Sequence, residues 1–248
     1  MTATYADLRG RAAVVTGGAS GIGEAIVRAL AGQGCRVGFL DIQADAGAAL
    51  ARELDATFVP CDLLDIDALR RAMATLHDRI GPARVLVNNA ANDQRQDFAA
   101  VTPDQFDWMM GVNFRHVYFA SQAVVPAMRD AGGGSIVNMS SVAWMGGGRD
   151  LQAYSAAKAA IVGFTNSLAR DVGLHRIRVN AVAPGMVITD RQRRLWYADE
   201  AQIEAVRSRQ SLPDAITPED IAQTVLFLAS DASRTVTKQC ISVNAGSR

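Results

Sequence analysis

The strongest indication of the fold is the stretch "AAVVTGGASGIGEAIVRALAGQG", residues 12–34. It begins as a short run of small and β-branched apolar residues, which is typical of a buried strand. A turn follows in which Gly17, Gly21 and Gly23 have the spacing G-x-x-x-G-x-G, and the turn opens directly into a helical pattern. Glycines in such a turn let backbone amides at the helix start approach a pyrophosphate. The stretch therefore predicts a strand–turn–helix unit that binds a dinucleotide.

The same alternation of strand-like runs and helical patterns continues along the chain. Strands are expected at 12–17, 36–41, 57–62, 84–91, 134–141, 178–185 and 240–246, and helices at 21–34, 44–55, 65–81, 103–131, 152–173 and 218–230. Strict alternation implies a parallel, doubly wound sheet. With no linker-like or repeated segment to divide it, residues 1–248 are predicted to form one Rossmann-type α/β domain with about seven parallel strands flanked by helices.

Composition and charge exclude several other classes of protein. The 248 residues carry 25 basic and 25 acidic side chains, so a nucleic-acid partner is not expected. The N-terminus lacks a signal-peptide pattern, and no apolar run approaches membrane-spanning length. Cys35, Cys61 and Cys240 have no metal-ligand spacing and are expected to be buried free thiols, which favours a reducing, cytoplasmic location without a bound metal.

An acidic residue indicates which dinucleotide is bound. Asp41 ends the second expected strand, twenty residues past Gly21, where a carboxylate can bind the adenosine ribose diol. The same carboxylate repels a 2′-phosphate, and neither Ser20 nor Ile42 brings a cation that would accept one. This pattern favours NAD over NADP. The alternative is that Asp41 is only a turn residue after a strand.

A second candidate site lies in "SSVAWMGGGRDLQAYSAAK", residues 140–158. Tyr154 precedes Lys158 by four residues and follows Ser141 by thirteen. Residues i and i+4 are neighbours on a helix, and the strand expected at 134–141 would bring Ser141 to the same sheet edge. An ammonium beside a phenol lowers the phenol pKa and makes it a usable general acid or base. The alternative is an ordinary exposed Tyr–Lys pair and an unrelated strand-end serine.

The most irregular segment is residues 184–220, which is polar, rich in Arg and expected to contain no strand. It leaves directly from the carboxyl end of the strand expected at 178–185. We therefore interpret it as a lid over the site, at about residues 186–215. A solvated surface helix with outward-facing charges is the alternative interpretation.

Taken together, these motifs resemble those of the short-chain dehydrogenase/reductase family, and the resemblance covers essentially the whole chain. "TGGASGIG" at 16–23 matches the cofactor loop of the family, "NNAA" at 88–91 its central-strand motif and "YSAAK" at 154–158 its catalytic Tyr–Lys pair. "CD" at 61–62 resembles the stretch that contacts adenine, and "PGMVIT" at 184–189 the stretch that contacts the nicotinamide amide.

The resemblance implies roles for individual residues. Tyr154 would be the acid/base, and Ser141 would position the reacting oxygen. Lys158 would lower the tyrosine pKa and bind the nicotinamide ribose, and Asn113 in "GVNF" would support a proton relay. The implied NAD site comprises Gly17, Ser20, Gly21, Ile22, Gly23, Asp41, Ile42, Asp62, Leu63, Asn89, Ala90, Ala91, Tyr154, Lys158, Pro184, Gly185, Val187 and Thr189.

The chain departs from the family pattern at three positions. Ala91 stands where glycine is common, and Lys238 and Asn244 stand where the family usually has a Thr-Gly turn and a closing Asp-Gly-Gly. The last two departures concern the entry to the terminal strand and contacts between subunits rather than the chemistry.

Within the family, the stretches "NNAANDQRQ", "VNFRHVYF", "SSVAW" and "TDRQRRLWYADEAQI" resemble sugar 1-dehydrogenases of the D-xylose dehydrogenase type. This resemblance implies oxidation of an aldose at C1 to the lactone, with an aldopentose such as D-xylose or L-arabinose as substrate. The candidate substrate contacts are polar or aromatic: Asn92, Asp93, Ser141, Trp144, Gln152, Tyr154, Arg191 and Trp196.

Two other functions are open at this point. One is a dehydrogenase of another hydroxylated metabolite, such as a deoxy-sugar acid or a 3-hydroxyacyl or ketoacyl compound. The other is a nucleotide-binding module without catalysis, which has no need of the complete set Asn113, Ser141, Tyr154 and Lys158.

The long helical patterns at 103–131 and 152–173 carry apolar residues around much of their circumference, more than one buried face requires. The family resemblance implies that they pack against symmetry mates in a homotetramer or homodimer. His116 is expected to be a packing or interface residue, whereas His77 and His175 are expected on the surface.

Overall fold

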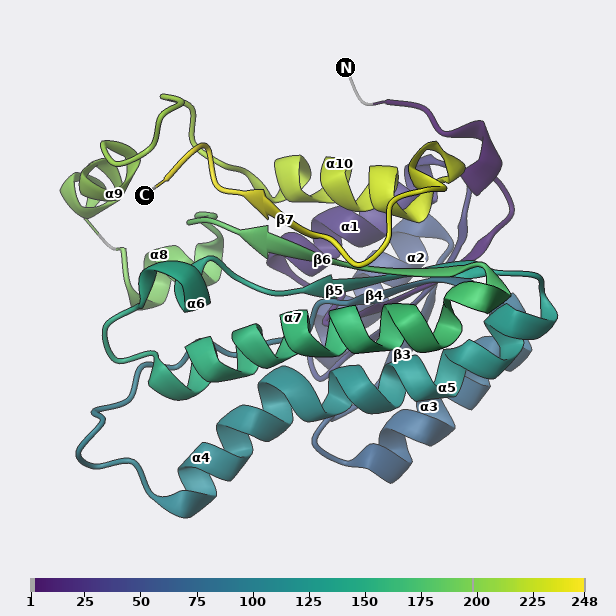
Figure 1. Ribbon diagram of the computed structural model, residues 1–248, viewed down its shortest axis with the longest axis horizontal. Helices are drawn as coiled ribbons and strands as arrows, with labels where there is room; N and C mark the ends of the chain where they lie inside the picture. Colours follow the sequence, from purple (N-terminus) through teal and green to yellow (C-terminus); the bar gives the residue numbers. More distant parts are fainter. Residues whose placement is uncertain (1–2, 198, 248) are drawn as a thin grey trace.

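The computed structural model describes residues 3–197 and 199–247. Within them the strands form one parallel sheet of order β3-β2-β1-β4-β5-β6-β7 (Figure 1). The strands are β1 (Ala12–Thr16), β2 (Arg36–Asp41), β3 (Thr57–Pro60), β4 (Ala83–Asn88), β5 (Gly134–Met139), β6 (Ile177–Pro184) and β7 (Cys240–Val243). The predicted doubly wound, single-domain α/β fold is confirmed.

Helices cover both faces of this sheet (Figure 1). One face carries α1 (Gly21–Gly32), α2 (Ala44–Leu54) and α10 (Pro218–Ala229). The other carries α3 (Ile66–Ile80), α4 (Pro103–Met110), α5 (His116–Asp130) and α7 (Gln152–Val172). Throughout the described ranges, no helix combines the length and apolar character needed to cross a membrane.

Alternate strand residues fill the two cores that this arrangement creates. Val15 and Val87 pack under α1 and α10, whereas Val14 and Leu86 pack under α3 and α5. Because both faces of a doubly wound sheet are buried, its strands are apolar on both sides. This explains the continuous apolar runs in the sequence. Because all seven strands are parallel, their carboxyl ends lie at one edge of the sheet.

The helix expected at 103–131 is interrupted. A π-helical turn, Gly111–Arg115, separates α4 from α5. Within the turn, Nδ2 of Asn113 donates to the carbonyl oxygens of Met109 (3.0 Å) and Asn92 (2.9 Å). The second of these bonds reaches a loop that is distant in the sequence, so helical periodicity alone gives no sign of the wider turn. Turns of this kind often occur at functional sites.

The segment expected to be a lid lies where the strands end. It contains two short helices, α8 (Asp190–Leu195) and α9 (Glu200–Arg207) (Figure 1), and a further short helix, α6 (Ala143–Gly146), follows β5. An isolated bridge between Val187 and Ile216 closes its base. Residue 198 of the expected lid lies outside the described residues.

The atypical C-terminal region still delivers a strand. Lys238 adopts φ = 63°, in the left-handed region that glycine enters at little cost. Its backbone N–H donates to the Val179 carbonyl at 2.8 Å, and β7 pairs with β6 directly afterwards. The lysine therefore occupies the backbone position of the usual glycine without preventing entry to the strand.

Candidate active site

The glycine turn after β1 is packed too tightly for side chains. Gly17 has φ = 66°, and a Cβ built on it would lie 2.7 Å from the Cα of Ala90. A Cβ on Gly23 would lie 1.8 Å from the Gly17 carbonyl oxygen. That oxygen also accepts a hydrogen bond from Nδ2 of Asn89 at 2.9 Å. This close-packed turn at the start of α1 fits a nucleotide pyrophosphate, as the sequence predicts.

Asp41 is buried at the end of β2 and is hydrogen-bonded to this turn. Its Oδ2 accepts from the backbone N–H of Ala19 (2.9 Å), and its Oδ1 accepts from the backbone N–H of Gln43 (2.9 Å). Nε2 of Gln43 in turn donates to Oγ of Ser20 at 3.0 Å. Sequence reasoning missed Gln43, because only the folded turn brings it back to Ser20. The carboxylate accepts these hydrogen bonds from uncharged amides.

The other expected cofactor residues lie along the same sheet edge. Oδ1 of Asp62, after β3, accepts from the backbone N–H of Leu64 at 2.9 Å. Gly185, after β6, donates its N–H to the Val243 carbonyl at 2.8 Å. A Cβ on Gly21 would lie 3.3 Å from Cγ2 of Thr189, so the start of the segment expected to be a lid approaches the glycine turn. The same edge holds Ile22, Ile42, Leu63, Ala90, Ala91, Pro184 and Val187.

Ser141, Tyr154 and Lys158 come together beside the end of β5. Lys158 is 2% exposed, and its Nζ donates to the Met139 carbonyl at 2.9 Å. Nζ lies 5.5 Å from the ring centroid of Tyr154. Oγ of Ser141 accepts from the backbone N–H of Ala143 at 3.1 Å. These contacts place the hydroxyl, phenol and amine at the carboxyl edge, as the sequence predicts.

The electrostatics of this group differ from the expectation. Burial raises the pKa of Tyr154 to about 12, while the neighbouring Ser141 hydroxyl acts in the opposite direction. Burial also lowers the pKa of Lys158 to about 7. The expected lowering of the tyrosine pKa by a neighbouring ammonium is therefore not observed. The physical reason is that burial disfavours the charged forms of both groups, including the ammonium itself.

Asn113 and His116 support the loop after β4. Oδ1 of Asn113 accepts from the backbone N–H of Asn92 at 2.9 Å, so its amide pairs with that backbone in both directions. His116 is fully buried, with Nε2 3.1 Å from the Ala90 carbonyl oxygen. Burial lowers the pKa of His116 to about 4, so it packs as a neutral ring.

The expected substrate residues divide into two groups. Asn92, Asp93, Arg191 and Trp196 lie where the segment expected to be a lid approaches the loop after β4. Asp93 and Arg191 form an ion pair with each other, although each was expected to contact substrate. Trp144 is 36% exposed on α6, and Gln152 is exposed at the start of α7.

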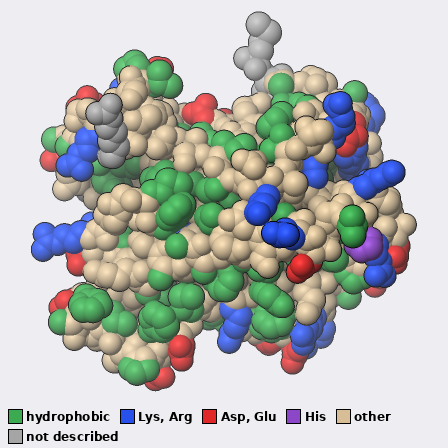
Figure 2. All heavy atoms as spheres, viewed as in Figure 1, with side chains coloured by type: hydrophobic (Ala, Val, Ile, Leu, Met, Phe, Trp, Pro, Cys, Tyr) green, Lys and Arg blue, Asp and Glu red, His purple; other side chains and the backbone are tan. Residues whose placement is uncertain are grey.

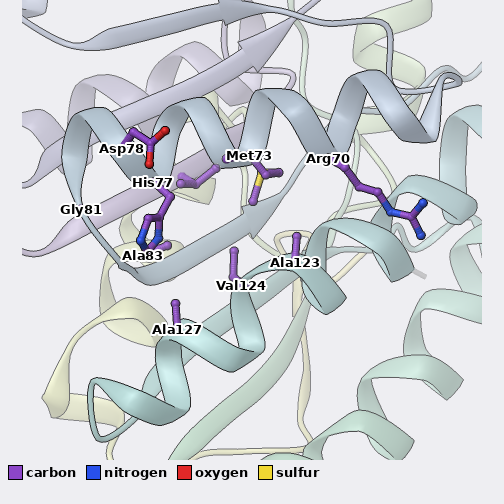
Figure 3. Close-up of a pocket in the computed structure, with 11 residues that line it drawn as sticks. Arg70, Met73, His77, Asp78, Gly81, Ala83, Ala123, Val124 and Ala127 are labelled. Carbon is purple, nitrogen blue, oxygen red and sulfur yellow. The ribbon is translucent and has the colours of Figure 1, made fainter.

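A cavity of about 250 Å³ lies elsewhere, between α3 and α5 (Figure 3). Met73, Val124 and Ala127 give it an apolar lining, with His77 and Arg70 at its side. No candidate site residue lines this cavity, and the chemistry that the sequence predicts is not found there.

The fold and the site together define a class of protein: an oxidoreductase that uses a nicotinamide cofactor. Residues 17–248 match the family described as enoyl-(acyl carrier protein) reductase. The chain belongs to the short-chain dehydrogenase/reductase family.

Several relatives are similar over nearly their whole length. "Probable galactose dehydrogenase GalD" of Rhizobium meliloti is 46% identical, over 98% of this chain and 96% of the relative. D-xylose 1-dehydrogenase of Caulobacter vibrioides is 42% identical, over 100% and 99%. Among solved structures, a short-chain type dehydrogenase/reductase from Mycobacterium ulcerans gives a TM-score of 0.91 at 26% identity, over 98% of this chain and 90% of the other.

A second solved structure bears on the cofactor. It is a blue fluorescent protein from a metagenomic library in complex with NADPH, with a TM-score of 0.89 at 35% identity, over 97% of this chain and 98% of the other. Sugar dehydrogenases are thus among the relatives, and at least one structural relative binds the phosphorylated dinucleotide.

Proposed function

We propose that this protein oxidises an aldose at its anomeric carbon to the lactone, with NAD as hydride acceptor. An aldopentose such as D-xylose or L-arabinose is the proposed substrate, and the lactone then hydrolyses to the aldonic acid. The observation that carries the proposal is the meeting of Ser141, Tyr154 and Lys158 at the sheet edge beside the glycine turn. Support for a sugar as substrate comes from two relatives described as sugar dehydrogenases, which are 46% and 42% identical.

Each residue of this group would have a separate role in the oxidation. Ser141 holds the reacting hydroxyl oxygen against Tyr154, whose phenolate takes the hydroxyl proton. Burial disfavours each charge alone, but a phenolate and the ammonium of Lys158 stabilise each other when both form. Asn113 holds the loop that borders this site through Asn92. A bound nicotinamide would supply the hydride acceptor.

The preference for NAD rests on Asp41. Its buried carboxylate bonds to the amides of Ala19 and Gln43, so it would present a fixed negative charge to the adenosine ribose. Such a charge repels a 2′-phosphate. NADP is the alternative, because a relative of 35% identity holds NADPH.

We also propose a homotetramer or homodimer in the cytoplasm. Hydrophobic side chains gather over α4, α5 and α7 (Figure 2), and Phe106 and Tyr118 are 45% and 48% exposed. Apolar surface of this kind favours packing against a second copy. Cys35, Cys61 and Cys240 are free thiols, as a reducing compartment favours. Light scattering at micromolar concentration should give a mass of at least twice 26.4 kDa.

The test is steady-state turnover with NAD, followed by absorbance of the reduced nicotinamide. Aldopentoses, aldohexoses, acyclic polyols, deoxy-sugar acids and 3-hydroxyacyl esters are compared, with Tyr154→Phe as the control variant. We expect turnover of at least one aldose, with discrimination among epimers. Turnover of a polyol or hydroxyacyl ester without any aldose would overturn the sugar assignment. Cofactor binding without turnover of any compound would favour the nucleotide-binding module.

A further inference from the structure

Two segments that are far apart in the sequence are joined by side chains at the catalytic edge. One is the loop after β4 and the other is the first part of the lid. We call their contact the clasp, and it consists of Asn92, Asp93, Arg95, Arg191, Gln192 and Trp196.

Asp93 is the centre of the clasp. Its carboxylate pairs with the Arg191 guanidinium through one oxygen and accepts from Nε2 of Gln192 (2.6 Å) through the other. Nη2 of Arg191 also donates to Oδ1 of Asn92 at 3.3 Å. Asp93 is 22% exposed and Arg191 is 41% exposed, so this is a partly exposed ion pair. Hydrogen bonds with an ionised partner are roughly twice as strong as neutral ones.

On the loop side of the clasp, a buried side chain holds the backbone. The backbone of Asn92 is held in both directions by the buried side chain of Asn113 in the π-helical turn. On the lid side, the Arg95 guanidinium lies 4.6 Å from the ring centroid of Trp196, within cation–π range. The lid therefore contacts the loop at two points, and the side chain of Asn113 holds the backbone of that loop in place.

The clasp also reaches the catalytic pair electrostatically. The negative charge of Asp93 raises the pKa of Tyr154 and of Lys158, and the positive charge of Arg191 lowers that of Tyr154. The Ser141 hydroxyl, just after β5, also lowers the pKa of Tyr154, and Lys158 faces Tyr154 from the same helix. The two charges of the clasp thus act on Tyr154 with opposite signs.

We propose that Asp93 is a positioning residue that locks the lid onto the loop after β4, through Arg191 and Gln192, at the catalytic edge. The proposal rests on the proposed function for the identity of the substrate. The locking of the lid does not depend on the proposed function, because it involves only residues of this chain.

Limited proteolysis without any substrate tests the closure. Chymotrypsin cleaves after aromatic residues and leucine, and the lid offers Leu195, Trp196 and Tyr197. Asp93→Ala and Arg191→Ala should each speed cleavage there by about fivefold, the upper range for a partly exposed ion pair. The charge-swapped double variant, Asp93→Arg with Arg191→Asp, should return the rate towards that of the unaltered protein.

The matched control is Arg193→Gln. Arg193 pairs with Glu200 at 3.4 Å inside the lid and makes no link to the loop. Its replacement should leave cleavage unchanged. Equal cleavage of all variants, or acceleration by Arg193→Gln as strong as by Asp93→Ala, would overturn the proposal.

A pH profile separates positioning from a merely structural role. Asp93→Ala should move the acidic limb of kcat/KM to lower pH, and Arg191→Ala should move it to higher pH, because Tyr154 must be deprotonated to act as the base and their charges act on it with opposite signs. Shifts in the same direction would contradict this. If the unaltered protein oxidises no sugar, the proposed function fails, whereas the proteolysis result still decides the closure.

Discussion

Replacing Lys158 by methionine should stabilise the protein while abolishing its activity. Burial lowers the lysine pKa from 10.5 to about 7, so an ammonium is disfavoured in the folded chain. At neutral pH that shift is worth about 4 kcal/mol of folding free energy. Methionine cannot donate to the Met139 carbonyl, and an unpaired buried carbonyl costs roughly 1–3 kcal/mol. The net gain is about 2 kcal/mol, or roughly 4–8 °C in Tm for a chain of this size.

The pH dependence identifies the cause. Because the pKa is lower in the folded state, the unfolded chain binds more protons between about pH 7 and pH 10.5, and the contribution of Lys158 to stability rises with pH across that window. The advantage of Lys158→Met should therefore shrink by roughly 1 kcal/mol for each pH unit above 7.

Urea unfolding at pH 7, 8, 9 and 10 and one protein concentration is the assay. The chain contains one other lysine, the exposed Lys238, and Lys238→Met is the matched control, which should show no such trend. A stability difference for Lys158→Met that stays constant from pH 7 to pH 10 would refute the reasoning.

Other substitutions test the chemistry and the cofactor turn. Tyr154→Phe should lower turnover by roughly 10²–10⁴-fold without loss of dinucleotide binding, measured by nicotinamide fluorescence; near-full activity would contradict its role. Asp41→Asn with Ile42→Arg should shift the kcat/KM ratio from NAD towards NADP, because Ile42 is 70% exposed and an arginine there can reach a phosphate. Gly23→Ala places a Cβ 1.8 Å from a carbonyl oxygen and should lower kcat/KM by about 10²-fold. Gly32→Ala, where a Cβ meets nothing within 4 Å, should leave activity unchanged.

The sheet and the catalytic edge could be predicted from the sequence because their signals are local. Apolar runs, the glycine turn and the i,i+4 spacing of Tyr154 and Lys158 each lie within one element or one connection. Strand ends of a parallel sheet then meet at one edge, whatever the details of packing. These features required no knowledge of long-range contacts.

The features that the sequence did not reveal depend on partners that only the fold supplies. The π-helical turn needs the bond from Asn113 to Asn92, and the clasp joins Asp93 to a lid residue 98 positions away. The direction of the Tyr154 pKa depends on burial, which spacing does not report. Gln43 was missed because its role depends on the folded position of Ser20.

The π-helical turn restricts where residues can be inserted into this chain or deleted from it. Successive residues of a helix are rotated by about 100°, so one residue added or removed between Pro103 and Asn113 would rotate the asparagine amide away from the Asn92 backbone. The surrounding helices would still pack, yet the loop at the site would lose its anchor. Insertions and deletions in related chains should therefore accumulate in residues 96–101, after the clasp and before the helix begins, and spare the helix itself.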